Sequence, residues 1–445
     1  MATPYQRIRL GYSDDTCKDP LSYPSGEAHG LLCSPTRGGK FRDVIAQILL
    51  TFEGSCFVID PKGQAAAVTA RYRKEVLKQD VCVLNPFNIL PEYIGPDRVR
   101  HAQYDPLKSK LRLDDPNMAA DADNLAEGLM PHSGSEVHWI DSARMLCSGM
   151  CLHAREKFPK FSLVDIYSMI SARELYDTCQ EAVEDKNSSR EVKARLSRFA
   201  GEEASENREI RSVVSTAITR LGFIGNKPIA DNLRKSTVDF RDMKKKPMTV
   251  YVILPGRYLA PYAAWLRTIT NSWADACLEE VRGAVPILGI LDEFKTAVGN
   301  LNAINTLNAL GAGYNCQLLT VLQDLTQLQD QNMYPRSWET FLANSGFKIF
   351  FSPRDWTTSE YISKMTGTIE VHPPTKSVGM NASMSTGSHG RRYMLPEDCR
   401  EMSENQMLAF IDGVPGVVIG GRRPYYEGDE FKGKYDTDPY HQPKS

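Results

Sequence analysis

The chain has 445 residues, 42% hydrophobic and 24% charged, which is the composition of an ordinary folded protein with two or three domains. Its formal net charge is −2, so the chain as a whole has no excess of positive charge that would attract nucleic acid. Binding of nucleic acid would need a local basic patch or an assembled ring. No uninterrupted apolar run reaches the length of a membrane span, and the N-terminus has no hydrophobic signal core, which predicts a cytoplasmic protein. The ten cysteines contain no CxxC pair, and we expect reduced, buried thiols.

Residues 1–27 are polar and rich in turn formers, and we expect them to form an irregular N-terminal arm. From His29 onward, short apolar runs alternate with segments of helical periodicity. This alternation is typical of right-handed βαβ units and predicts an α/β fold with a mostly parallel sheet. The first apolar run, at 31–33, leads into the loop SPTRGGK, and a helix follows it to about Phe52.

This loop is typical of a phosphate-binding loop. The backbone N–H groups of Gly38 and Gly39 can surround phosphate oxygens, Lys40 can reach the outer phosphates, and the helix directs its positive end at them. Ser34 occupies the position of the usual first glycine, and Phe41 replaces the usual metal-binding Ser or Thr. An ordinary strand-to-helix loop with a surface lysine is the alternative for this stretch taken alone.

The next segments predict two domains. After a strand at 55–60 and another within 80–87, the strand pattern is lost over 115–225, where one helical segment follows another. We therefore expect an inserted all-α domain there, with the α/β domain made of 28–114 and 226–435. The many charged residues of the insertion favour a solvated helical face over a partner-binding surface.

Strands return at 248–254, and the apolar run 285–291 ends in two carboxylates, Asp292 and Glu293. This is the Walker B pattern of a buried central strand with acidic residues at its C-terminal edge. We expect Asp292 to hold Mg²⁺ and Glu293 to polarise the water that attacks the γ-phosphate of ATP. Because such a pair also occurs by chance at strand ends, the interpretation depends on the loop at Lys40.

Gln323 and Asp324 follow the next apolar strand, which comes after a helix expected at 296–310. Gln323 can sense the γ-phosphate from this position, and an ordinary polar strand end is an equal alternative. In the remaining chain we expect a strand at 347–355 and a mobile loop at 377–389. A hairpin is expected at 407–421 and a polar tail at 436–445.

Several motifs stand in order along the chain: SPTRGGK, FVIDPKG, VLNPF, HWIDSARML, LDEF and RRPYYEG. Together they resemble the type IV secretion coupling proteins, the ATPases of bacterial conjugation. The resemblance implies a RecA-like P-loop NTPase domain with an inserted all-α domain, bound ATP and Mg²⁺, and ring-shaped hexamers. It implies Asp292 at Mg²⁺, Glu293 at the water and Gln323 at the sensing position. The residues it implies at the phosphates are Thr36, Arg37, Gly38, Gly39 and Lys40.

The resemblance also implies a function, namely recruiting DNA–protein or protein substrates to a type IV secretion channel. A relaxase, a relaxosome or effector proteins would dock on the all-α domain, with DNA and channel components as further partners. Family members usually carry an N-terminal membrane anchor, and this chain begins almost directly at the ATPase domain. We therefore expect either a membrane-free relative or a soluble portion of such a protein, cytoplasmic or peripheral at the inner membrane.

Phe41 departs from the small residue usual in the family and predicts an ATPase with weak turnover. Two alternatives remain. One is a hydrolysis-impaired scaffold or adaptor of the same system that docks partners, and the other is a double-strand DNA translocase.

Overall fold

The computed structural model describes residues 7–132, 137–281, 283–371 and 389–441. Within these ranges a 12-stranded sheet forms the centre of the fold, and eight of its strands run parallel. In order across the sheet, the parallel strands are β10 (Ser345–Phe350), β3 (His29–Cys33), β9 (Cys316–Leu322), β8 (Ile287–Leu291), β4 (Ser55–Ile59), β7 (Met248–Val252), β5 (Asp80–Leu84) and β6 (Arg100–His101).

The parallel strands are apolar along their length because both faces of the sheet are covered. Every residue of β4, β7 and β8 is buried. Strands covered by helices on both faces read as continuous apolar runs rather than alternating ones. The predicted α/β class with a mostly parallel sheet is therefore confirmed.

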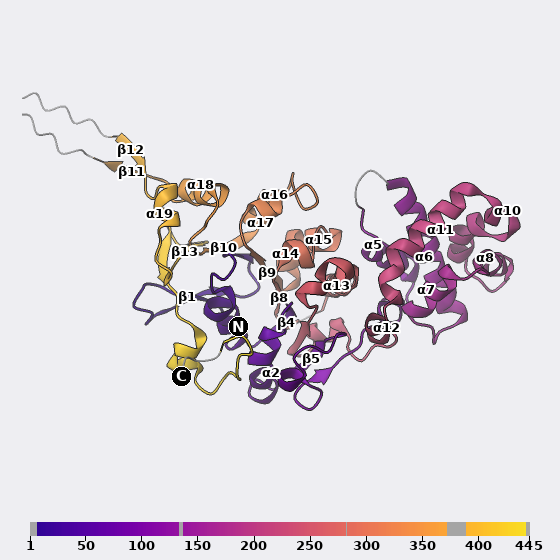
Figure 1. Ribbon diagram of the computed structural model, residues 1–445, viewed down its shortest axis with the longest axis horizontal. Helices are drawn as coiled ribbons and strands as arrows, with labels where there is room; N and C mark the ends of the chain where they lie inside the picture. Colours follow the sequence, from indigo (N-terminus) through magenta and orange to yellow (C-terminus); the bar gives the residue numbers. More distant parts are fainter. Residues whose placement is uncertain (1–6, 133–136, 282, 372–388, 442–445) are drawn as a thin grey trace, which may run out of the picture.

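Helices of the sheet-bearing part cover both faces and join the strands (Figure 1). The helix expected over 296–310 is broken into two, with Gly299 at a φ of +69° between them. The helices are α1 (Ala46–Leu49), α2 (Gln64–Glu75), α3 (Pro91–Ile94), α4 (Pro106–Lys110), α12 (Lys227–Leu233), α13 (Gly256–Cys277), α14 (Phe294–Ala297), α15 (Asn302–Leu310), α16 (Thr326–Gln329), α17 (Trp338–Ala343), α18 (Trp356–Met365) and α19 (Pro396–Arg400).

The antiparallel edge corrects one prediction. The segment 1–27 is not an irregular arm where it is described, because β1 (Arg7–Tyr12) and β2 (Pro20–Pro24) form a hairpin. β1 also pairs with β14 (Val418–Gly421), the second strand of the predicted C-terminal hairpin with β13 (Gln406–Ile411). Ile8, Leu10 and Tyr12 are buried in alternation with two arginines. This period of two does not by itself predict a strand, because polar residues and turn formers surround it.

Between 115 and 225, the described residues contain helices and no strand (Figure 1). Ser162 and Asp165 form a capping box at the start of α7 (Leu163–Ser171), where the Ser162 N–H donates to the Asp165 carboxylate at 2.7 Å. The helices are α5 (Met118–Leu129), α6 (Val137–Lys157), α7 (Leu163–Ser171), α8 (Leu175–Glu184), α9 (Arg190–Leu196), α10 (Gly201–Glu206) and α11 (Arg208–Leu221).

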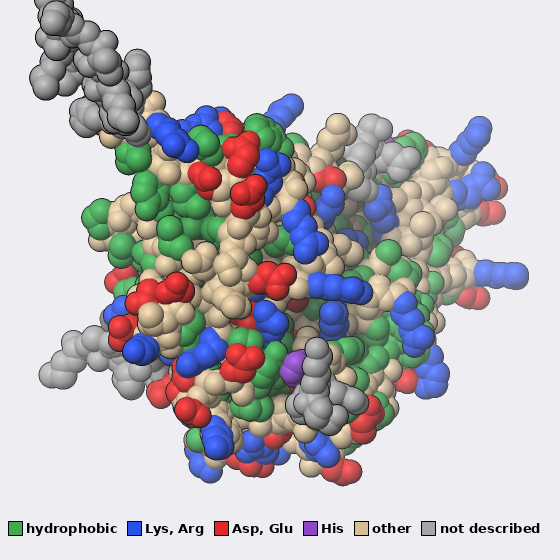
Figure 2. All heavy atoms as spheres, turned by 60° about the vertical axis from the view of Figure 1, so that its left-hand side comes forward, with side chains coloured by type: hydrophobic (Ala, Val, Ile, Leu, Met, Phe, Trp, Pro, Cys, Tyr) green, Lys and Arg blue, Asp and Glu red, His purple; other side chains and the backbone are tan. Residues whose placement is uncertain are grey.

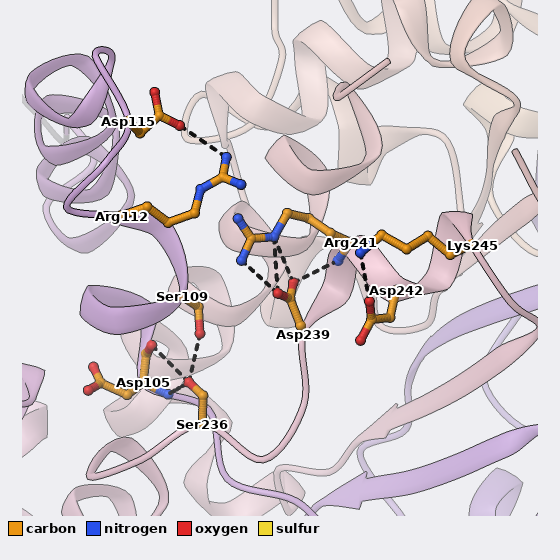
Figure 3. Close-up of polar contacts among 9 residues, drawn as sticks. All are labelled: Asp105, Ser109, Arg112, Asp115, Ser236, Asp239, Arg241, Asp242 and Lys245. Carbon is orange, nitrogen blue, oxygen red and sulfur yellow. Dashed lines mark hydrogen bonds and ion pairs between the residues drawn. The ribbon is translucent and has the colours of Figure 1, made fainter. Parts of the chain in front are cut away.

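Two chain segments connect these helices to the sheet, and they run side by side. The Thr237 N–H donates to the Gln103 carbonyl at 2.9 Å, and the Asp105 N–H donates to the Ser236 hydroxyl at 2.9 Å. Figure 3 shows the Ser236 hydroxyl also meeting that of Ser109, at 2.7 Å. The outgoing and returning segments are thus held together where they leave the sheet.

The end of the chain is packed more closely than a polar tail implies. Residues 436–441 form no regular element, yet the Asp436 N–H donates to the Val68 carbonyl of α2 at 2.9 Å, and the Tyr440 hydroxyl donates to the Lys62 carbonyl at 3.0 Å.

All ten cysteines are described and none forms a disulfide. The loop expected over 377–389 lies outside the described residues except for its last residue, which begins β12 (His389–Arg392), the partner of β11 (Thr368–Val371). Of the helices that are described, none has the length and apolarity that crossing a membrane requires.

Candidate functional site

The carboxyl ends of β3, β9 and β8 meet at one edge of the sheet because these three parallel strands are neighbours. Residues 34–40 follow β3, Gln323 follows β9, and Asp292 and Glu293 follow β8. Ligands of open α/β sheets bind at this edge. Residues about 250 positions apart along the chain therefore come together in one site.

Lys40 stands between the two carboxylates. Its Nζ lies 2.6 Å from Asp292 Oδ1 and 2.9 Å from Glu293 Oε1. Burial raises the pKa of Asp292, and the Lys40 ammonium opposes this shift. The Lys40 ammonium thus lies against both carboxylates and is at the position from which it would face phosphate oxygens.

Gln323 links the loop to the carboxylates. Its Oε1 accepts a hydrogen bond from the Thr36 hydroxyl at 3.0 Å, and its Nε2 donates to Glu293 Oε2 at 3.1 Å. Glu293 itself has a φ of +52°, a left-handed conformation that costs energy for a residue with a Cβ. Such strain is found most often where a side chain must be aimed at a ligand.

The loop backbone has the tight curvature of a phosphate cradle. Arg37 and Gly39 have φ values of +63° and +93°. A Cβ at Gly39 would lie 2.6 Å from an oxygen of Asp43, so only glycine fits there without a shift. Ser34 is buried beneath the loop, where its N–H donates to the Leu322 carbonyl at 2.9 Å, and it supports the loop from below.

A cavity of about 310 Å³ opens between the loop, the ends of β4 and β8, and the end of the chain. Asp60, which follows β4, lies in its wall; burial raises the pKa of this carboxyl to about 7, and a hydrogen bond from the Ala66 N–H opposes the shift. Phe41 also lines the cavity and meets Tyr425 edge-on, with ring centroids 6.1 Å apart. Other lining residues include Arg37, Gly38, Gly39, Lys40, Lys62, Gln64, Asp292, Glu293, Tyr426, Asp438, Tyr440 and His441.

Sequence reasoning missed two charged residues behind the loop. Asp43 is fully buried, and Arg422 Nη2 lies 2.6 Å from its Oδ2. Arg422 also donates to the Gly38 carbonyl, and its guanidinium carbon lies 3.5 Å from the centre of the Phe351 ring. No local pattern could relate Asp43 to Arg422, because the two residues are 379 positions apart.

A parallel sheet with a phosphate-type loop after one strand and a lysine-bound carboxylate pair after a near neighbour defines a P-loop NTPase of the RecA-like class. The family model of type IV secretory system conjugative DNA transfer proteins matches residues 10–442. The chain belongs to this family.

Relatives and solved structures agree with this assignment. The chain is 26% identical over 442 residues to protein VirD4 of Rhizobium rhizogenes, covering 95% of this chain and 62% of that protein. It is 23% identical over 460 residues to the conjugal transfer protein TraG of Escherichia coli, covering 94% and 70%. The chain thus spans less than two thirds of the VirD4 protein.

The plasmid coupling protein TrwB, in complex with the non-hydrolysable ATP analogue ADPNP, has the same fold. It superposes with a TM-score of 0.67 at 14% identity, covering 95% of this chain and 90% of that one. TrwB in complex with ADP and Mg²⁺ superposes with a TM-score of 0.66, also at 14% identity and with the same coverage.

Proposed function

We propose that the protein is a coupling ATPase of a type IV secretion system, which binds ATP with Mg²⁺ and recruits DNA–protein or protein substrates to the channel. The observation that carries this proposal is the contact of Lys40 Nζ with both Asp292 and Glu293 at 2.6 and 2.9 Å. A phosphate-facing lysine beside a metal-binding carboxylate and a water-polarising carboxylate is the arrangement that phosphoryl transfer to water needs.

Each residue has a role in this reaction. The N–H groups of Gly38 and Gly39 surround the phosphates, and Lys40 neutralises charge on the outer ones. Asp292 holds Mg²⁺, which when bound would neutralise the charge that develops on the phosphates. Glu293 accepts a hydrogen bond from the attacking water and polarises it. Gln323, bonded to Glu293, relays the state of the γ-phosphate to the loop through Thr36.

Partners and assembly extend the proposal. We infer that the helices α5 to α11 dock a relaxase, a relaxosome or effector proteins, and that the chain forms hexameric rings that contact channel components. On the face drawn in Figure 2, acidic and basic side chains are interspersed. DNA contact by that face would therefore depend on an assembled ring rather than on one chain. The names of two relatives, a type IV secretion system-coupling protein VirD4 and a conjugal transfer protein TraG, support the part of the proposal that concerns substrate transfer.

The test is a titration with fluorescent ATP followed by a turnover assay with and without DNA. Lys40→Ala should abolish nucleotide binding, and Glu293→Gln should keep binding but stop turnover, because the water loses its polarising partner. Lys227→Ala is the matched control, since this lysine on α12 has a side chain that is 84% exposed.

The outcomes separate the candidate functions. Turnover that DNA stimulates supports a motor-like coupling ATPase or a DNA translocase, whereas binding without turnover supports the scaffold or adaptor. Wild-type protein that binds no nucleotide, or a Lys40→Ala variant that binds as well as wild type, would overturn the proposal.

A further inference from the structure

The last residues of the described chain form a fixed strap, which we define as residues 425–441. Its apolar anchors are Tyr425 and Phe431, which are 1% and 0% exposed and pack against Val68 and Tyr72 of α2. A segment with its own buried aromatic residues is held in place and does not behave as a free tail.

Polar contacts then guide the strap along α2 toward the cavity. Arg71 Nε lies 2.6 Å from the carboxylate of Asp436, and Gln64 Nε2 donates to both oxygens of Asp438 at 3.0 and 2.9 Å. Arg71 lies in the second half of α2 and Gln64 begins it. The strap therefore follows the helix back to its N-terminus, beside the end of β4, and Figure 1 shows the yellow C-terminal segment next to α2.

At the cavity the strap presents aromatic rings. Tyr426 and His441 stack with ring centroids 4.3 Å apart and planes inclined by 13°. Both residues line the same cavity as Gly38, Gly39 and Lys40. Because the two rings are already in van der Waals contact, a third flat group would stack on an outer face of the pair.

We infer that the strap forms the subsite for the base of a nucleoside triphosphate, with the Tyr426–His441 pair stacking on the base while the loop holds the phosphates. The inference rests on the proposed function, since it assigns the second half of the same ligand. Every base has a π-face, so stacking of this kind distinguishes a nucleotide from a bare polyphosphate more than it distinguishes one base from another.

The experiment compares two ligands by calorimetry, ATP and inorganic tripolyphosphate, both with Mg²⁺. In Tyr426→Ala and in His441→Ala the affinity for ATP should fall about 10-fold, the size of a lost stacking contact, while the affinity for tripolyphosphate stays unchanged. Tyr426→Phe keeps the ring and should keep the ATP affinity. Tyr393→Ala, at a tyrosine that is 48% exposed and does not line the cavity, is the matched control.

The two ligands separate this inference from the proposed function. If the alanine variants bind ATP as tightly as wild type, or lose ATP and tripolyphosphate together, the strap is not a base subsite although the phosphate site stands. If wild type binds tripolyphosphate and ATP equally well, the base subsite is likewise overturned. Binding of neither ligand by wild type would overturn both the inference and the proposed function.

Discussion

Arg422 holds the phosphate loop from behind, through the carbonyl of Gly38 and the buried carboxylate of Asp43. Arg422→Met would leave Asp43 buried beside Arg42 alone and would release the loop. We expect the free energy of unfolding to fall by about 1–3 kcal/mol, the cost of a buried group that loses its partner. The affinity for nucleotide should fall as well, because the loop backbone would lose the contact that Arg422 makes with the Gly38 carbonyl.

Denaturant titration and nucleotide titration check this prediction, with Arg423→Met as the control. Arg423 is the adjacent arginine and pairs with the partly exposed Glu430 at 2.8 Å. A variant Arg422→Met with wild-type nucleotide affinity would show that the loop keeps its shape without this support.

Asp60 makes the stability of the protein depend on pH. Burial raises its pKa to about 7, whereas an aspartate in an unfolded chain titrates near 3.9. Between about pH 4 and pH 7 the folded protein therefore holds a proton that the unfolded chain has lost, so the contribution of Asp60 to the free energy of unfolding falls as the pH rises through this window. Above about pH 7 the loss is complete.

Asp60→Asn removes this dependence, since an amide is neutral and its oxygen can still accept from the Ala66 N–H. We expect the variant to be more stable than wild type at pH 8 and equally stable at pH 4. Urea unfolding at the two pH values measures the difference, with the exposed Asp97→Asn as the control. Equal effects of Asp60→Asn at both pH values would contradict the assignment.

Phe41 can supply no oxygen to a metal and packs against Tyr425 instead. The loss of one charge-stabilising contact costs on the order of 10²-fold in the rate of phosphoryl transfer, so we expect slow turnover with nucleotide binding retained. Phe41→Ser should raise kcat at saturating ATP and Mg²⁺, whereas Phe41→Ala, which removes the ring without adding a hydroxyl, should not. A wild type that already turns over at tens per second would rule this account out.

At the scale of elements, Asp105 connects the sheet to the helical segment. Its carboxylate accepts from the Leu107 N–H of α4 at 3.1 Å and from the Leu163 N–H of α7 at 3.2 Å. Burial raises the pKa of this carboxyl to about 6, and the Leu163 N–H opposes the shift. One side chain thus caps the first turns of two helices, α4 and α7.

Asp105→Ala would leave both N–H groups without this acceptor. We expect it to lower the free energy of unfolding by about 1–3 kcal/mol, and Asp105→Asn, which keeps one oxygen, to lower it less. Urea unfolding monitored by circular dichroism measures both, beside the exposed Asp114→Ala. An Asp105→Ala variant as stable as Asp114→Ala would mean that the two helices find other partners.

Elements with a strong local pattern could be predicted from the sequence. β4, β7 and β8 are apolar throughout because both faces are covered. Because ligands bind at the carboxyl ends of the strands in such sheets, Lys40 and Asp292 could be predicted to lie in one site. The rest depends on contacts between distant segments. β1 joins the sheet through its pairing with β14, about 400 residues away, and its short alternation among turn formers does not predict this place. The arginine behind the loop comes from the far end of the chain and leaves no local signal.

At the scale of the whole molecule, the segment 115–225 remains a proposed domain. Its connecting segments run side by side at Gln103 and Thr237, which favours removal with a short linker. α5 packs against α13, however, and a Cβ at Gly128 would lie 2.7 Å from Asn271, so the deletion would uncover part of α13. We expect the trimmed protein to bind nucleotide with a lower thermal midpoint than the full chain.

Nucleotide titration and thermal unfolding of the trimmed protein check this, with the full chain measured in parallel. A trimmed protein that does not fold would show that the helices are part of the packing of the sheet domain.

The strap also sets an order of events during synthesis. One wall of the cavity is made by residues 37–65 and another by residues 426–441. A ribosome that adds 5–20 residues per second needs roughly 20–80 s to make the chain between them. A chain that ends between Arg422 and the strap keeps the arginine behind the phosphate loop but lacks this second wall of the cavity. On the role inferred for the strap, tight binding of ATP would therefore distinguish a chain that includes the strap from one that ends before it.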